Sequence, residues 1–417
     1  MEKKRYVIIG TGPAGISAAK LLAKIDPESN ITLIGKESYL PYSPTILPYF
    51  ISGKIEEKDI FLLKRNELKD YNINLILGNG VSSVYPKEEK VFLEDGTSIS
   101  YDRLIIANGG RPIIPDIKGL KDSKPLVLRT LEDAKILKQK AKTSKKAIVL
   151  GGGLIGMQVS QALSEMGISV WVIEMMDQVL PGYFDKQSSS MIQKVYESHR
   201  VKILISSTID EVEYKKGEYS VSIKGGKKVY GQLFIVATGV KPNIDPFKGS
   251  GIELDKGILV DSSMRTNIPN IFAAGDIVQA DGFWKEGKVN QPILIHAVDQ
   301  GRIAAQNAFG EEISYAGNIS MNLFHFFGNE AISIGMTKTD SKDEYYIHRI
   351  YNPKKKKYIK FVFDEKGLVG IMGINVDLDP GILLQLIRQR ISISKDKKEF
   401  IKKPLEFGRK LMCQNWR

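Results

Sequence analysis

The chain has 417 residues, of which 42% are hydrophobic, so it is long enough for two or three domains with their own cores. Its single cysteine, Cys413, excludes a disulfide framework, an internal redox dithiol and an iron–sulfur cluster bound by this chain alone. No apolar run approaches the ~18 residues that span a membrane, and the N-terminus shows no signal peptide, so we expect a cytoplasmic protein without a membrane segment.

The net charge is +12, and residues 316–417 carry 19 basic and 11 acidic side chains, so +8 of the excess lies in the last quarter of the chain. This asymmetry indicates an acidic partner that docks near the C-terminal region. An ordinary lysine-rich, solvated surface explains it equally well.

The first pattern along the chain is an apolar run, residues 6–9, that leads into G-x-G-x-x-G at Gly10, Gly12 and Gly15. It predicts a buried strand that turns tightly into a helix. The first glycine permits the turn, the second lets a diphosphate approach the backbone, and the third lets the helix pack on the strand. The helix N-terminus then offers N–H groups to the phosphate oxygens.

A second strand is predicted at residues 30–35, with Glu37 at its end, about 20 residues after the last glycine, where a ribose-binding carboxylate is expected. Residues 38–50 are rich in proline and aromatic residues, which indicates a loop over a ligand or a surface turn. Further strands are predicted within 74–84, 90–100 and 104–109, the second with a hairpin at Asp95-Gly96.

The opening pattern occurs a second time, where residues 147–150 lead into Gly151, Gly153 and Gly156. A partner strand, 169–173, then ends at Glu174, 18 residues after the last glycine. Two such patterns, each with an acid in register, predict two dinucleotide sites in two similar domains. Glu174 favours NADH over NADPH, because a carboxylate accepts ribose hydroxyl hydrogen bonds but repels a 2′-phosphate.

Residues 230–239 repeat the apolar strand ending in glycine, and residues 270–276 predict a short strand that ends at Asp276. This aspartate can accept a hydrogen bond from a polyol chain or cap a helix. Residues 295–308 predict an amphipathic helix that begins near His296. Its N-terminus supports about +0.5 charge, which would stabilise a ring that becomes anionic on reduction.

These motifs make roughly residues 4–375 resemble the pyridine-nucleotide-dependent flavoprotein reductases. The motifs are Gly10-x-Gly12-x-x-Gly15, Ala107-Asn-Gly109, Gly151-x-Gly153-x-x-Gly156, Ala237-Thr-Gly239-x-x-Pro242 and Phe272-Ala-Ala-Gly-Asp276. Leu40-Pro-Tyr-Ser is similar to the branch that contains NADH:rubredoxin reductase, ferredoxin reductase and the nitrite reductase flavin domain. The stretches beginning at Asp379 and at Pro404 resemble the FAD subunits of phenylglyoxylate dehydrogenase and tungsten aldehyde oxidoreductase.

The resemblance implies an α/β fold with two Rossmann-like, three-layer domains of the glutathione-reductase type and a C-terminal α+β domain. The expected FAD domain is discontinuous, 1–112 and 245–315. The NAD(H) domain is 113–244, and the C-terminal interface domain with its helical tail is 316–417.

The resemblance also implies a cofactor for each glycine motif and no metal. The FAD residues would be Gly10, Gly12, Pro13, Ala14, Gly15, Glu37, Val81, Ala107, Gly109, Gly275, Asp276, His296 and Ala297. The NAD(H) residues would be Gly151, Gly153, Leu154, Ile155, Gly156, Glu174 and Gly239. Ala297 would direct its N–H toward the flavin pyrimidine edge.

Three departures from the family pattern bear on the chemistry. Ser43 and Pro44 stand where disulfide- and peroxide-reducing relatives have a cysteine, and a serine forms neither a reactive thiolate nor a sulfenic acid. Tyr49 and Gln158 replace a lysine–glutamate pair, and we expect them to form a neutral substitute near flavin and nicotinamide. Asn108 replaces the usual threonine, without an evident reason.

The function implied is hydride exchange between NADH and FAD, with electrons passing to or from rubredoxin, ferredoxin or an iron–sulfur subunit. The alternatives are a peroxide-forming NADH oxidase and an apoptosis-inducing-factor-like binding protein, although no base-stacking aromatic residues are evident for nucleic acid.

The C-terminal domain is expected to suit an oligomer or complex interface. It is predicted to contain strands within 319–336, 345–350, 358–363 and 368–372 and a helix at 380–391. There Phe324 to Phe327 form packing core or face the flavin, Lys354–Lys357 lie in a hairpin turn, and 395–403 with the final helix form a docking arm.

Overall fold

The computed structural model describes residues 3–284, 287–339, 341, 344–393 and 397–415. The chain forms two compact units, and we describe each by itself. The first contains 1–113, 128–138 and 239–318, and the second contains 114–127, 139–238 and 319–417. Since the second unit includes the C-terminal region, the division into three domains stays a prediction. Trp416 and residues 395 and 396 of the predicted docking arm lie outside the described residues.

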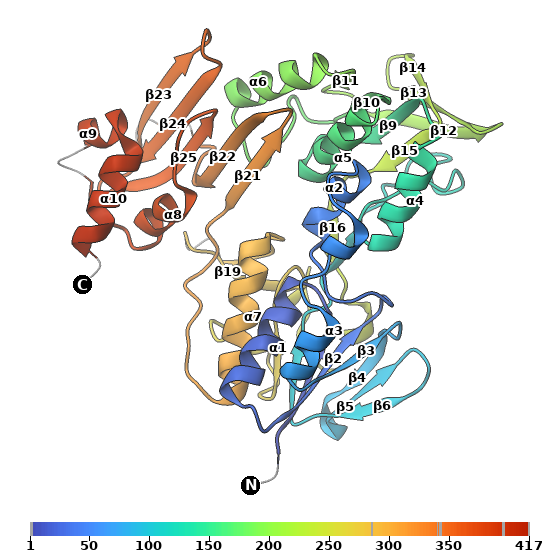
Figure 1. Cartoon of the computed structure of the whole chain (residues 1–417), viewed down its shortest axis with the longest axis vertical. Helices are drawn as coiled ribbons and strands as arrows, with labels where there is room; N and C mark the ends of the chain where they lie inside the picture. The colour runs from blue at the N-terminus through green and yellow to red at the C-terminus, as the bar shows by residue number, and fades with distance from the viewer. Residues whose placement is uncertain (1–2, 285–286, 340, 342–343, 394–396, 416–417) are drawn as a thin grey trace. The chain divides into compact units, whose positions relative to one another are not determined.

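The first unit is built on a parallel sheet of five strands in the order β18-β7-β1-β2-β3 (Figure 1). These strands are β1 (Arg5–Ile9), β2 (Asn30–Gly35), β3 (Ile73–Leu77), β7 (Arg103–Ile106) and β18 (Ile271–Ala273). The central strands are buried, because parallel sheets are covered on both faces and so need continuous apolar sequence.

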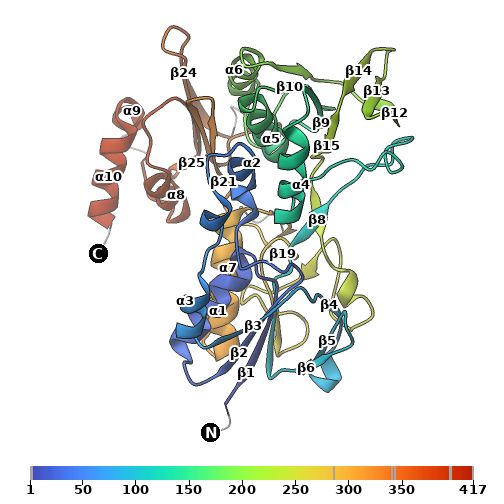
Figure 2. The same cartoon turned by 45° about the vertical axis from the view of Figure 1, so that its right-hand side comes forward.

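Two helices, α1 (Pro13–Ile25) and α7 (Leu294–Phe309), lie side by side in the first unit (Figures 1 and 2). They approach closely because small residues meet at their crossing. A Cβ on Gly301 of α7 would lie 2.3 Å from the Ala14 carbonyl oxygen of α1. Ala18 and Ala19 of α1 are fully buried, so this pair of helices forms part of the core of the unit.

Smaller elements complete the first unit. They are the antiparallel β4 (Val81–Tyr85), β5 (Lys90–Leu93) and β6 (Ser98–Ser100); the pair β8 (Gly110–Pro112) and β16 (Val240–Pro242); β17 (Ile258–Leu259), β19 (Val278–Asp281) and β20 (Lys288–Val289); and α2 (Leu47–Ile51), α3 (Arg65–Asp70) and the start of α4 (Leu131–Ala141). Short 3₁₀ turns cover Pro44–Ile46, Glu57–Asp59, Pro86–Glu88 and Asp245–Phe247. The hairpin predicted at Asp95-Gly96 is confirmed, with φ +87° at Gly96.

The second unit contains a parallel four-stranded sheet in the order β11-β10-β9-β15. Its strands are β9 (Lys146–Leu150), β10 (Ser169–Ile173), β11 (Val201–Leu204) and β15 (Leu233–Val236). Helices α5 (Leu154–Glu165) and α6 (Lys186–Glu197) follow β9 and β10, and an antiparallel sheet of β12 (Ile209–Lys215), β13 (Glu218–Ile223) and β14 (Lys228–Gly231) precedes β15. The α/β fold that the family resemblance implies is confirmed.

The C-terminal part of the second unit is an antiparallel sheet in the order β21-β22-β25-β24-β23 (Figure 1). The strands are β21 (Met321–Phe326), β22 (Asn329–Gly335), β23 (Tyr346–Asn352), β24 (Lys357–Phe363) and β25 (Leu368–Ile374), followed by α8 (Pro380–Arg388), α9 (Lys397–Lys402) and α10 (Pro404–Asn415). Helix α9 packs Phe400 against Phe361 and Phe363 on one face of the sheet. On the other face, the Tyr358 hydroxyl donates to Asp185 at 2.6 Å.

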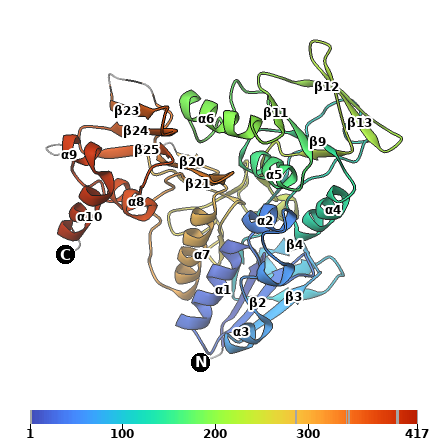
Figure 3. The same cartoon turned by 45° about the horizontal axis from the view of Figure 1, so that its top comes forward.

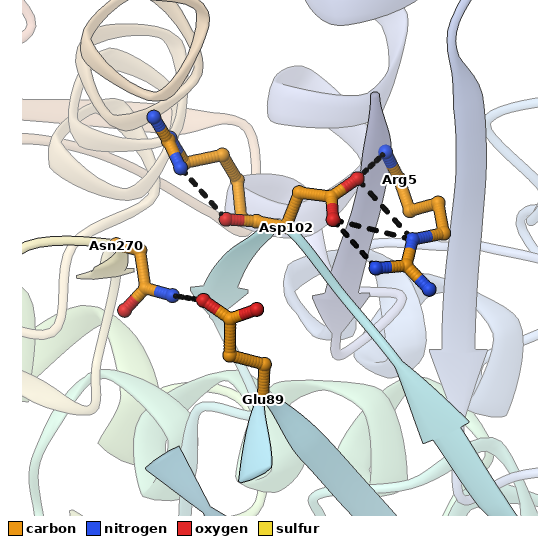
Figure 4. Close-up of polar contacts among 5 residues, drawn as sticks. Arg5, Glu89, Asp102 and Asn270 are labelled. Atoms are coloured by element: carbon orange, nitrogen blue, oxygen red, sulfur yellow. Dashed lines mark hydrogen bonds and ion pairs between the residues drawn. The ribbon is translucent and has the colours of Figure 1, made fainter. Parts of the chain in front are cut away.

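An ion pair fastens the amino ends of β1 and β7 in the first unit (Figure 4). The Asp102 carboxylate accepts from the Arg5 backbone N–H at 2.7 Å and from Arg5 Nη2 at 2.6 Å. Glu89 accepts from Asn270 Nδ2 at 2.8 Å close by and connects the turn before β5 to the segment that precedes β18. The Arg5 guanidinium lowers the pKa of Asp102, so folding favours the ionised carboxylate.

We therefore expect Asp102→Asn to destabilise the first unit by about 1 kcal/mol, which lowers its thermal unfolding midpoint by about 2 °C. Because the pKa of Asp102 in the folded protein lies below its ordinary value, this contribution is present at neutral pH and is lost as the pH falls through the folded pKa. Thermal unfolding at pH 7 and at pH 3 measures the difference. The control is Glu28→Gln, since the Lys3–Glu28 pair is exposed and should contribute almost nothing. Equal effects of the two substitutions at pH 7 would contradict the prediction.

Candidate dinucleotide sites

The first glycine motif forms a cradle between β1 and α1. Gly10 has φ +110°, and a Cβ there would lie 2.2 Å from the Ala107 carbonyl oxygen. A Cβ on Gly15 would lie 1.9 Å from the Gly10 carbonyl oxygen, so strand and helix are in direct backbone contact. A Cβ on Gly12, in contrast, would meet nothing within 4 Å. Gly12 is the N-cap of α1 and leaves open space before the helix N-terminus, which is where a diphosphate fits.

The second glycine motif has almost the same geometry in the second unit. Gly151 has φ +109°, and a Cβ there would lie 2.3 Å from the Ala237 carbonyl oxygen. A Cβ on Gly156 would lie 2.0 Å from the Gly151 carbonyl oxygen, whereas one on Gly153, the N-cap of α5, would meet nothing within 4 Å. The repeat seen in the sequence is therefore a repeat of backbone geometry as well.

Glu174 lies at the end of β10 beside this second cradle and is 8% exposed. One carboxylate oxygen accepts from the Gly152 N–H at 2.6 Å, and the other accepts from the Met176 N–H at 2.8 Å. These two bonds fix the orientation of the carboxylate and leave further lone pairs for hydroxyl donors. Leu154 and Ile155 form the first turn of α5. Gly239 belongs to the first unit, so its place in the same site stays a prediction.

Asp276 follows β18 in the first unit and pairs with Arg129, whose Nη2 lies 3.0 Å from Asp276 Oδ2. A Cβ on Gly109 would lie 2.9 Å from the same guanidinium nitrogen, so Arg129 adds a half-buried cation to the predicted FAD residues. The sequence reasoning missed Arg129. The capping box formed by Thr130 and Asp133 signals that a helix begins there, but it gives no indication of the partner of the arginine.

A second residue missed in the sequence is Gln300 of α7, which is 2% exposed. Its Oε1 accepts from the Gly275 N–H at 2.9 Å and holds the turn before Asp276, where Gly275 has φ +85°. Asn290 holds the other side, since its Nδ2 donates to the Asp276 carbonyl at 2.8 Å.

Helix α7 begins as predicted, with buried His296 and Ala297 in its first turn. One detail of the prediction is wrong. The Ala297 N–H donates to the Ile293 carbonyl at 3.1 Å, so the helix itself already uses it. The first N–H groups of an α-helix have no carbonyl partner within the helix, so the N–H groups that precede Ala297 are the ones available to a ligand. Pro13 begins α1, and Val81, at the start of β4, is 9% exposed.

Glu37 has a structural partner besides the ribose predicted for it. Both of its carboxylate oxygens accept from the Tyr42 hydroxyl, at 2.9 and 2.8 Å, and the Leu131 N–H at the start of α4 donates to Glu37 at 3.3 Å and to Tyr42 at 2.7 Å. Burial raises the pKa of Glu37 and, more strongly, that of Tyr42. Glu37 thus caps α4, and its role toward a ribose stays a prediction.

Asn108 follows β7, and its side chain accounts for the departure from threonine. Its Nδ2 donates to the Asn243 carbonyl at 3.0 Å, a contact that ties β7 to the segment after β16. Its Oδ1 is buried and has no hydrogen-bond partner in the described part of the chain. A buried acceptor without a donor is costly, so this atom fits a site that a ligand donor completes.

The two remaining candidates lie in different units. Tyr49 is half-buried on α2 and Gln158 is half-buried on α5, so their pairing stays a prediction. Phe324 and Phe326 are buried in the second unit and stack with Tyr196, while His325 is half-exposed beside Glu330. The described residues contain no group of three or more His, Cys, Asp or Glu that could bind a metal. Nor does any described helix meet the length and apolarity that crossing a membrane requires.

Two open cradles, each at a strand–helix turn with an acid nearby, define a protein that binds two dinucleotides. Comparison with known proteins makes this specific. The family model described as pyridine nucleotide-disulphide oxidoreductase matches residues 4–305, and the chain belongs to that family. It is accordingly an FAD-dependent oxidoreductase that uses NAD(H).

Among curated proteins, the chain is similar to NADH-dependent phenylglyoxylate dehydrogenase subunit epsilon of Aromatoleum evansii, at 36% identity over 100% of this chain and 99% of the relative. It is 33% identical to an NADH oxidase of Methanocaldococcus jannaschii, over 88% of this chain and 86% of the relative. Among solved structures, NADH:rubredoxin oxidoreductase from Clostridium acetobutylicum matches with a TM-score of 0.75 and 26% identity, covering 94% of this chain and 97% of that one.

The contacts of Glu174 predict the coenzyme preference. In Glu174→Ala/Met175→Arg, the carboxylate that repels a 2′-phosphate is removed and an exposed position beside it gains a cation, so kcat/KM for NADPH should rise above that for NADH. Steady-state kinetics with both nucleotides measures this. The control is Asp177→Asn, which removes a nearby carboxylate that pairs with Lys186 and should leave the preference unchanged. A wild-type protein that uses both nucleotides equally would contradict the assignment.

Proposed function

We propose that this protein exchanges a hydride between NADH and FAD and passes the electrons to or from a protein redox partner, without a redox-active cysteine. The observation that carries the proposal is the pair of cradles, one in each unit, with open space at Gly12 and Gly153. Each provides the space and helix N-terminus that a diphosphate needs.

The first cradle is the proposed FAD site. Gly10, Gly12, Ala14 and Gly15 would hold the diphosphate, with Arg129 adding positive charge. Asp276 would accept from the ribityl chain while the Arg129 ion pair holds its carboxylate in place. The cofactor would supply a hydrogen-bond donor to Asn108 Oδ1, which has none in the described part of the chain. Glu37, Val81 and the first turn of α7 would bind the remaining parts of the cofactor.

The second cradle is the proposed NAD(H) site, with Glu174 accepting from the adenosine ribose. FAD, when bound, supplies the acceptor for hydride transfer from the nicotinamide and the means to release electrons one or two at a time. The chain's contribution would be to bind and orient the two cofactors, because positioning is the main requirement of this step. Tyr49 and Gln158 are the candidates for positioning residues beside the rings.

The absence of a suitable cysteine disfavours dithiol and sulfenic acid chemistry. Cys413 is the only cysteine of the sequence, and it is exposed on α10. No ligand set for an iron–sulfur cluster is available from one thiol. An electron-transfer wire must therefore belong to another protein, as the match over the full chain with a subunit of a larger dehydrogenase also suggests.

A peroxide-forming NADH oxidase is the second candidate, favoured by the similarity to the archaeal NADH oxidase. In that case, the NADH-reduced protein would be reoxidised by air about as fast as it turns over. In the leading proposal, reoxidation by air is slow and a protein acceptor accelerates it. Stopped-flow reoxidation separates the two.

Matched substitutions in the two cradles should weaken the binding of FAD and of NADH independently. Gly12→Ala places a methyl group in open space, so the protein should fold but bind FAD about tenfold or more weakly. Gly153→Ala should retain FAD and lose NADH affinity by a similar factor. Gly182→Ala, which also meets nothing within 4 Å, is the control and should change neither. FAD content and NADH titration of the three variants test the assignment, and FAD loss from Gly153→Ala with retention in Gly12→Ala would reverse it.

A basic protein that reduces an acidic carrier should show salt sensitivity. We expect the NADH-dependent rate with rubredoxin to fall several-fold between about 50 and 300 mM salt, while the rate with the neutral quinone menadione stays nearly constant. A rubredoxin rate that is unaffected by salt would count against an electrostatic partner site.

A further inference from the structure

Strand β23 is an open edge of the C-terminal sheet. It is the last strand in the order β21-β22-β25-β24-β23, and within the described chain β24 is its only pairing partner. Figures 1 and 3 show it at the outer margin of this sheet. The strand has seven residues, so one side of its backbone presents a row of N–H and C=O groups to an added strand.

Apart from Arg349, the side chains of β23 do not carry the charges that usually protect an edge strand. Tyr346, Ile350 and Tyr351 are 50%, 43% and 49% exposed. The register places Tyr346 and Ile350 on one face of the sheet and Tyr351 on the other, so both faces of the edge offer apolar contact area. An exposed strand of this length normally has charges along it, which prevent pairing with other chains.

The other charges of this hairpin are concentrated next to the strand. Residues 345–363 contain six basic residues and no acidic residue. Lys354, Lys355, Lys356 and Lys357 are exposed in and beside the turn that joins β23 to β24, and none of them forms an ion pair within the described chain. Only Lys360 is buried, where it donates to the Thr337 and Thr339 carbonyls. The edge thus combines a side without a pairing strand in the described chain, exposed apolar side chains and a basic end.

This combination selects the occupant. A second copy of β23 in antiparallel register would place its basic turn at the opposite end of the paired strands, and since residues 346–352 contain no acidic residue, it would bring no carboxylate of β23 to the lysines. An acidic segment of another protein would pair with the backbone and neutralise the lysines at the same time. We propose that β23 docks an extended, acidic segment of the redox partner by adding it to the sheet as a sixth strand. This inference rests on the proposed function in one respect, namely that the chain works with a protein partner.

The test uses the full-length, FAD-loaded protein and a fluorescein-labelled peptide in which glutamate alternates with valine. Fluorescence anisotropy gives the affinity, and hydrogen–deuterium exchange locates the bound peptide. We expect slower exchange in residues 346–352 and an affinity that falls about tenfold in Lys354→Glu/Lys355→Glu. The matched control is Lys215→Glu/Lys216→Glu, which reverses two exposed lysines at the β12–β13 turn and should bind like wild type.

Three results would overturn the inference. The first is binding without protection of residues 346–352. The second is an equal loss of affinity in the two double variants, which would mean general attraction to a basic chain. The third is protection of β23 that grows with protein concentration without peptide, which would mean that a second copy occupies the edge. Menadione reduction by the same preparation reports the proposed function separately, since it needs both cofactors but no docked strand.

Discussion

The contact on which the structure depends is the one between backbone and backbone at each strand–helix turn. The carbonyl oxygens of Gly10 and Gly151 lie only 1.9 and 2.0 Å from where a Cβ on Gly15 and on Gly156 would be. Only glycine allows this approach, and the approach aims the N-terminus of α1 or α5 at a space with no side chain in it. In the proposed sites, Glu174 in the second unit, and Arg129 and Asn108 in the first, would contact the ligand that this backbone geometry admits.

Much of this could be predicted from the sequence because glycine spacing and apolar runs are local signals. The alternation of strand and helix, the β5–β6 hairpin and helices α7 and α8 follow from such patterns. The association of the C-terminal sheet with the second unit does not, because it depends on contacts such as Ser333 Oγ to the Tyr183 carbonyl, 150 residues apart. Sequence spacing gives no information on such a pair.

The residues of the candidate sites also divide into those that the sequence predicts and those that it does not. The glycines and the acids at the ends of strands are predictable because their positions relative to a strand are fixed. Arg129 was missed because its partner, Asp276, is 147 residues away in the sequence. Gln300 was missed because it accepts from the N–H of Gly275, 25 residues away. Glu37 shows the opposite case. It lies at the position expected for a ribose-binding acid, but it also accepts hydrogen bonds from the Tyr42 hydroxyl and the Leu131 N–H, which the sequence pattern does not reveal. The role of Asn108 depends on its hydrogen bond to the Asn243 carbonyl, 135 residues away in the sequence, which no local pattern indicates.

The central claim is that one chain holds FAD and accepts a hydride from NADH. The visible absorption spectrum of the purified full-length protein, recorded without air before and after addition of NADH, tests it most directly. The account predicts one FAD per chain and bleaching of the flavin absorption by stoichiometric NADH. A colourless protein that takes up no FAD, or a bound flavin that NADH leaves oxidised, would contradict it.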